Sequence, residues 1–144
     1  MKINKHIQLK TSKEFEVRFS EVDSMNIVWH GSYVLYFEDA REQFGKEFGL
    51  SYMHYFNNGY YAPLVELSFN YKKPLLYEQK ARIDIIYRNV PAAKVMFDYE
   101  IRLVSDNSLI ATGSSTQVFL DREYNLVLSN PAFYEAWKRN HDLL

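Results

Sequence analysis

R-F-S-E-V-D-S-M-N-I-V-W-H-G-S-Y-V-L-Y-F-E-D-A-R-E-Q-F-G-K-E-F, residues 18–48, is the segment around which this 144-residue chain is organised. At its start, residues 14–19 alternate apolar and charged side chains, which is the period of a half-buried strand. The next residues, Asp23 to Asn26, have the composition of a turn, because Asp and Ser side chains bond nearby amides and Asn tolerates a positive φ. We therefore expect a strand over Glu14–Phe19 that leads into a bend carrying Asp23.

The period changes at Ser32 to that of an α-helix. Aromatic and small apolar side chains recur every three or four residues on one face, at Tyr33, Phe37, Ala40, Phe44 and Phe48. We expect other elements of the fold to pack around a helix with so many aromatic side chains. With Gly31 or Ser32 as N-cap, unpaired amides and the positive end of the helix dipole would lie near His30, where they suit a developing oxyanion.

The rest of the chain predicts a sheet. Four alternating stretches predict long antiparallel strands, over residues 61–71, 80–88, 94–104 and 109–120. We expect a loop over Leu50–Gly59 before them and a short helix over Pro131–Asn140, with Asn130 as its N-cap, after them. Small residues on one face of the fourth stretch leave room for a bulky neighbour: Ala111, Gly113 and Ser115. The order predicts an α+β fold with a five-stranded antiparallel sheet around one long helix.

Composition limits the class of protein. The length predicts a single domain over residues 1–144. A net charge of −1, from 17 basic and 18 acidic residues, argues against nucleic acid as a partner. The lack of cysteine excludes disulfides and a thiol nucleophile, and no apolar run is long enough to predict a membrane span. Without a signal-peptide pattern, we expect a soluble cytoplasmic protein.

Two further expectations concern metals and assembly. The four histidines lack metal-ligand spacing and the H-E-x-x-H motif is absent, so we expect no metal. The G-x-S-x-G elbow of serine hydrolases is absent too. A single sheet around one helix leaves its edges and outer face uncovered, so we expect a homodimer or homotetramer.

Several of these residues together resemble a known family. Asp23-Ser24-Met25-Asn26-Ile27-Val28-Trp29-His30, followed by Tyr36-Phe37-Glu38-Asp39-Ala40-Arg41, resembles the signature of hot-dog acyl-CoA thioesterases of the 4-hydroxybenzoyl-CoA thioesterase type. This type includes the thioesterases associated with the Tol-Pal system. With further similarity in the later strands, the resemblance covers about residues 14–135.

The resemblance implies a hot-dog fold and hydrolysis of a small acyl- or aroyl-CoA to free acid and CoA. By it, Asp23 attacks the thioester carbonyl or activates water, and a backbone N–H near His30 binds the oxyanion. No cofactor is expected, because coenzyme A is part of the substrate. The family also implies an active site at a subunit interface. Asn26 stands where the family commonly has Gly, and Asn is well suited to the same left-handed conformation.

Other residues are weaker candidates for binding the substrate. Tyr33 would form a pocket wall, and Asn26 would lie beside the substrate on the bend that carries Asp23. Lys73, Arg88 and Lys94 would meet the CoA phosphates, although basic residues at strand ends are more often simply solvated. Glu38 is interesting because a helix Glu is the catalytic base in a second hot-dog subgroup. Its simpler interpretation is a glutamate at the edge of the core that bonds to the backbone or pairs with Arg41 three residues on.

Two other functions stay open. A hot-dog dehydratase acting on acyl-carrier-protein thioesters would pair His30 with Glu38 or Asp39. Alternatively, the fold could serve a non-catalytic protein that binds acyl-CoA. Hydration of an enoyl thioester would indicate the first function, and binding without thiol release the second.

Overall fold

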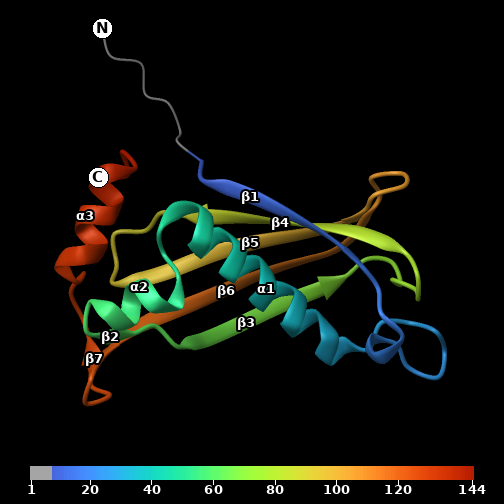
Figure 1. Cartoon of the computed structure of the whole chain (residues 1–144), viewed down its shortest axis with the longest axis horizontal. Helices are drawn as coiled ribbons and strands as arrows, with labels where there is room; N and C mark the ends of the chain where they lie inside the picture. The colour runs from blue at the N-terminus through green and yellow to red at the C-terminus, as the bar shows by residue number, and fades with distance from the viewer. Residues whose placement is uncertain (1–7) are drawn as a thin grey trace, which may run out of the picture.

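A curved antiparallel sheet forms the larger part of the molecule, and one long helix crosses its concave face (Figure 1). The computed structural model describes residues 8–144. The elements in chain order are β1 (Lys10–Glu16), the 3-10 turn η1 (Phe19–Glu21), α1 (His30–Phe48), α2 (Tyr52–Asn57), β2 (Tyr60–Tyr61), β3 (Leu64–Tyr71), β4 (Lys80–Arg88), β5 (Lys94–Leu103), β6 (Leu109–Asp121), β7 (Leu126–Val127) and α3 (Ala132–Asn140).

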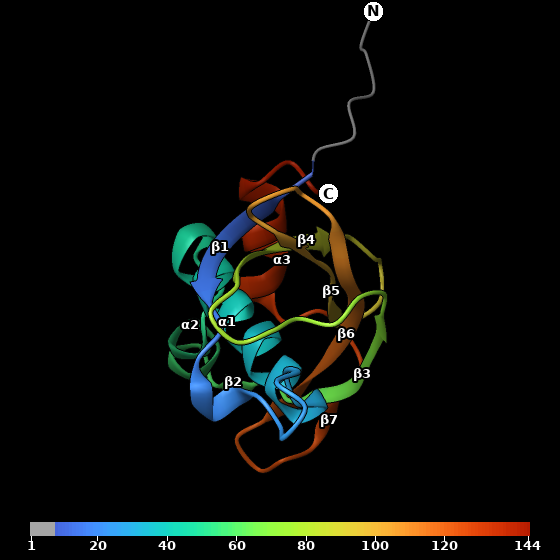
Figure 2. The same cartoon turned by 90° about the vertical axis from the view of Figure 1, so that its right-hand side faces the viewer.

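The long strands lie in the order β1-β4-β5-β6-β3, and every pairing is antiparallel. The short strands β2 and β7 pair with the far end of β6, which brings the five predicted strands to seven. Viewed nearly along the helix, the sheet curls around α1 (Figure 2). This is the predicted α+β arrangement, and α3 closes the end of the sheet opposite the N-terminus of α1 (Figure 1).

The aromatic face of α1 forms the core of the molecule. Phe37 and Phe44 are both fully buried, and Phe37 packs on Tyr99 of β5 with ring centroids 4.6 Å apart. A methyl group at Gly113 would lie 2.9 Å from the Phe37 ring, so this position needs a residue without a side chain. The bulky neighbour predicted for the small-residue strand is therefore the helix itself.

The first strand differs from its prediction. It covers Lys10–Glu16 and not Glu14–Phe19, because it pairs with β4, and Glu16 lies opposite Lys80, the first residue of β4. Beyond that point the sheet offers the chain no partner strand. The chain turns into η1, and Phe19 is 76% exposed and packs edge-on against Tyr77.

Four element boundaries also differ from the sequence prediction. The strand predicted over residues 61–71 is divided into β2 and β3, and β3 begins at Leu64. The helix α1 begins at His30 with Trp29 as N-cap, earlier than expected. The predicted loop at residues 50–59 contains the helix α2, and Ser51 is its N-cap. The His54 amide donates a hydrogen bond to the Ser51 carbonyl oxygen at 3.0 Å. The terminal helix has Pro131 and not Asn130 at its N-cap. Strand β4 has the predicted bounds.

Across residues 8–144, no helix combines the length and the apolar character needed to cross a membrane.

Replacing Gly113 by Ala should destabilise the fold by about 1–3 kcal/mol, because the new methyl group meets the Phe37 ring and lies 3.1 Å from the Ser68 carbonyl oxygen. Urea unfolding of the variant measures this cost. In a Phe37→Leu background the same substitution should cost clearly less, since the ring is gone. An equal cost in both backgrounds would show that Phe37 does not set the limit at this position.

Candidate active site

A tight hairpin between η1 and α1 fixes Asp23. The Asp23 amide donates to the Ile27 carbonyl at 2.9 Å, and its Oδ1 accepts the amides of Met25 at 2.8 Å and Ile27 at 3.3 Å. Asn26 adopts φ 64°, the left-handed conformation expected from the sequence. The carboxylate is therefore held by its own turn through one oxygen. Oδ2 has no partner among residues 8–144.

The hairpin also fixes the start of α1. The Trp29 amide donates to the Glu21 carbonyl at 2.8 Å, and the Val28 amide donates to the Leu75 carbonyl at 2.8 Å. No side chain of residues 8–144 caps the helix. Within the described part of the chain, the amides of His30 and Gly31 have no acceptor, so two N–H donors and the positive end of the helix dipole are available there.

Asp23 and this helix terminus line one cavity of about 350 Å³, here called the Asp23 cavity. Its walls come from the hairpin, the first turn of α1 and the segment after β3. The lining residues are Asp23, Ile27, Val28, Trp29, His30, Tyr33, Tyr71, Lys72, Lys73 and Pro74. Four of the sequence-predicted site residues thus meet here: Asp23, His30, Tyr33 and Lys73.

The polar residues of the Asp23 cavity include Tyr33 and two lysines, Lys72 and Lys73. Tyr33 is 2% exposed, and burial, with a smaller contribution from Tyr71, raises its pKa to about 12. Its hydroxyl therefore stays protonated at neutral pH. The two lysines follow directly on β3, and both of their amides donate to the Ile110 carbonyl, at 2.7 and 3.1 Å.

Four other predicted substrate residues do not line the Asp23 cavity in one chain, and Asn26, on its exposed turn, is the first of them. Glu38 lines a second cavity, and the predicted ion pair between Glu38 and Arg41 is absent among the described residues. Arg88 pairs with Asp98. Arg88 and Lys94 flank the β4–β5 turn, at the opposite end of the sheet from the N-terminus of α1 (Figure 1).

Glu21, the second carboxylate near Asp23, is used for structure. It accepts the Tyr36 hydroxyl at 3.0 Å and the Arg18 amide at 2.8 Å. Burial and the nearby Glu21 carboxylate raise the pKa of Tyr36. Glu21 does not line the Asp23 cavity, which leaves Asp23 as the carboxylate placed for chemistry there.

Trp29 is a residue of the site that sequence reasoning did not single out. Its side chain is 53% exposed, and an added Cβ on Gly31 would lie 1.9 Å from its ring. The indole therefore covers Gly31, beside the two free amides. One feature of the sequence could have indicated this contact. Gly31 stands two residues after Trp29, at the start of a helix, where glycine is otherwise unfavourable.

Known proteins match the chain in sequence and in structure. A family model described as the thioesterase-like superfamily matches residues 17–137. A Bacillus subtilis relative, provisionally named as the acyl-CoA thioesterase YneP, is 32% identical over 114 residues, which are 78% of this chain and 81% of the relative.

Two solved structures share the fold. The DHNA-CoA thioesterase of Staphylococcus aureus has a TM-score of 0.80 at 26% identity, with 93% of this chain and 92% of that one covered. A 1,4-dihydroxy-2-naphthoyl-CoA thioesterase from Synechocystis has a TM-score of 0.80 at 18% identity, with 92% and 98% covered.

The chain belongs to the thioesterase-like superfamily, and its fold is the predicted hot-dog thioesterase fold. Membership places it among the thioester hydrolases.

Replacing Gly31 by Ala should push the Trp29 indole away from the start of α1, because the two cannot occupy the same space. The chain has two tryptophans, and Trp137 is 7% exposed, so acrylamide quenching of fluorescence in a Trp137→Phe background reports on Trp29. Quenching should increase in the Gly31→Ala variant. Unchanged quenching would mean that the indole does not rest on Gly31.

Proposed function

We propose that this protein hydrolyses an acyl-CoA thioester in the Asp23 cavity, releasing a free acid and CoA. In this reaction Asp23 attacks the thioester carbonyl or directs a water to it, and the amides of His30 and Gly31 bind the oxyanion. One observation carries the proposal: the Asp23 carboxylate and His30, whose helix amide has no acceptor among residues 8–144, line the same cavity.

These groups are sufficient for thioester hydrolysis. A thiolate is a good leaving group and needs no strong general acid, so one carboxylate and one oxyanion site meet the main demands of the reaction. Asp23 suits its part because Oδ1 is held by the amides of Met25 and Ile27, which leaves Oδ2 for the chemistry. The helix dipole adds to the field that favours negative charge on the carbonyl oxygen.

The walls of the cavity favour a small aromatic acyl group. Trp29, Tyr33 and Tyr71 contribute rings, and Tyr33 meets Tyr71 edge to face at 4.9 Å. A volume of about 350 Å³ suits one or two rings. The name of the 26% identical relative, a DHNA-CoA thioesterase, supports an aroyl-CoA substrate. Within the family we propose the 4-hydroxybenzoyl-CoA thioesterase type, on the signature around Asp23 and His30.

Lys73, together with Lys72, is the proposed contact for the CoA phosphates, because both residues line the cavity that holds Asp23. Arg88 and Lys94 could take part only if another subunit brought them near. We also propose a cytoplasmic location, which the cysteine-free sequence supports.

Assembly into a homodimer or homotetramer, with the site near the interface, is part of the proposal. Strand β3 pairs only with β6 among the described residues, so one of its edges is open. Exposed apolar side chains lie on that strand and on α1: Val65 is 58% and Leu35 56% exposed. Tyr71, at the end of β3, lines the Asp23 cavity and is 49% exposed, so a subunit covering this edge would adjoin the site.

The dehydratase alternative receives no support from the geometry of one chain. His30 and Glu38, the pair it requires, line different cavities, and Asp39 is exposed and lines neither of them.

Replacing Asp23 by Asn should lower kcat for thiol release from benzoyl-CoA or another aroyl-CoA by about 10²–10⁴-fold, because the amide is neither a nucleophile nor a base. Asn keeps a side-chain oxygen that can accept the Met25 amide, so the turn and the fold should survive. Circular dichroism and a thermal melt check this.

Glu21→Gln is the matched control, since it removes a neighbouring carboxylate that does not line the Asp23 cavity. Its kcat should stay within a few-fold of the wild type, because Gln can still accept the Tyr36 hydroxyl. A folded Asp23→Asn protein that hydrolyses the substrate at the wild-type rate would rule out the mechanism.

A further inference from the structure

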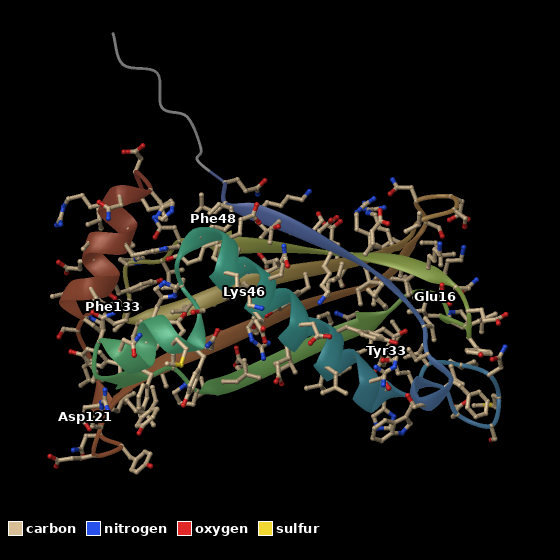
Figure 3. The ribbon with its side chains drawn as sticks, viewed as in Figure 1. Glu16, Tyr33, Lys46, Phe48, Asp121 and Phe133 are labelled. Carbon is tan, nitrogen blue, oxygen red and sulfur yellow. The ribbon has the colours of Figure 1, made fainter. Side chains whose placement is uncertain are left out.

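A second and larger cavity, of about 540 Å³, lies along α1 beside α2. We call it the Arg41 cavity. It shares no lining residue with the Asp23 cavity. Figure 3 labels one α1 residue from each: Tyr33 of the Asp23 cavity lies toward the N-terminal end of the helix and Lys46 of the Arg41 cavity toward its C-terminal end.

A fixed arginine lines this cavity. Arg41 Nη1 donates to the Tyr99 hydroxyl at 3.2 Å, and the Tyr99 hydroxyl is 2.6 Å from Ser115 Oγ. Tyr99 is 1% and Ser115 2% exposed, so the anchor of the guanidinium is buried and rigid. Arg has five N–H donors, and this contact uses one.

Arg41 forms no ion pair within 4.0 Å among residues 8–144. Glu38 and Glu42 line the same cavity, but neither forms an ion pair with Arg41. Glu42 pairs instead with Lys46 at 3.0 Å. The guanidinium is therefore half-buried, held in place, and left with donors to satisfy.

Gln117 lines the same cavity. Gln117 Nε2 donates to the Ala62 carbonyl at 2.7 Å, which fixes the amide group. Its Oε1 is buried without a hydrogen-bond partner in the described part of the chain. The apolar side chains of Phe97 and Leu50, both almost fully buried, complete this part of the cavity.

We propose that the Arg41 cavity is a second ligand site, which binds a small organic acid with an aromatic or apolar body. Arg41 binds the carboxylate through two parallel N–H donors, which is the geometry that a guanidinium offers and a lysine does not. Phe97 and Leu50 contact the body of the same ligand. A cavity of this size is within the range of small-molecule sites.

This site does not depend on the proposed hydrolysis, because none of its residues takes part in that reaction. Free acids are nevertheless the class of product that thioester hydrolysis releases. The site would therefore let the acid bind away from the place where it is formed.

Isothermal titration calorimetry with 4-hydroxybenzoate tests the proposal, with 4-hydroxybenzamide as the neutral analogue. The wild type should bind the acid at least 10-fold more tightly than the amide. Arg41→Met should weaken binding of the acid at least 10-fold, whereas Asp23→Asn should leave it unchanged. Lys46→Met is the matched control: it removes a cation from the same cavity that is already paired with Glu42, and should change binding less than 3-fold.

Several results would overturn the proposal. These are equal affinity for acid and amide, no binding of the acid at millimolar concentration, or full binding by a folded Arg41→Met protein. A clear change in the affinity for the acid in Asp23→Asn, in either direction, would place the acid in the Asp23 cavity instead. Should Arg41→Met fail to fold, the acid and amide comparison on the wild type, and Tyr99→Phe, which should weaken acid binding by releasing the guanidinium, still decide the question.

Discussion

The packing of the aromatic face of α1 on the small residues of β6 is the contact on which the rest of the structure depends. Phe37 can approach the sheet because Gly113 has no side chain, and its ring also packs on Tyr99 and Phe69. This contact sets the position of the helix along the sheet. It therefore also sets where the first turn of α1 stands, and with it the pair of free amides at His30 and Gly31.

The hairpin couples that helix terminus to Asp23. A hydrogen bond from the Trp29 amide to the Glu21 carbonyl joins the two ends of the segment, and the Asp23 side chain holds the turn between them. The same carboxylate therefore shapes the loop and faces the cavity. The turn uses Oδ1 of Asp23, which leaves Oδ2 for the catalytic role proposed above.

Features that arise within a short segment could be predicted from the sequence. The stripe from Tyr33 to Phe48, the bounds of β4 and the left-handed Asn26 depend on neighbouring residues. Features that depend on distant partners could not. The ends of β1 are set by its pairing with β4. Arg41 contacts Tyr99, which lies 58 positions further along the chain, so the sequence around Arg41 could not predict this contact in place of the expected pair with Glu38. Which residues line each of the two cavities likewise could not be predicted without the folded structure.

A crystal structure with a CoA analogue in which a methylene group replaces the thioester sulfur would test the central claim most directly. Such a ketone resists hydrolysis and keeps the carbonyl group. The account predicts its oxygen within about 3 Å of the His30 or Gly31 amide, with Asp23 Oδ2 facing the carbonyl carbon. A carbonyl bound away from both amides and from Asp23 would contradict it.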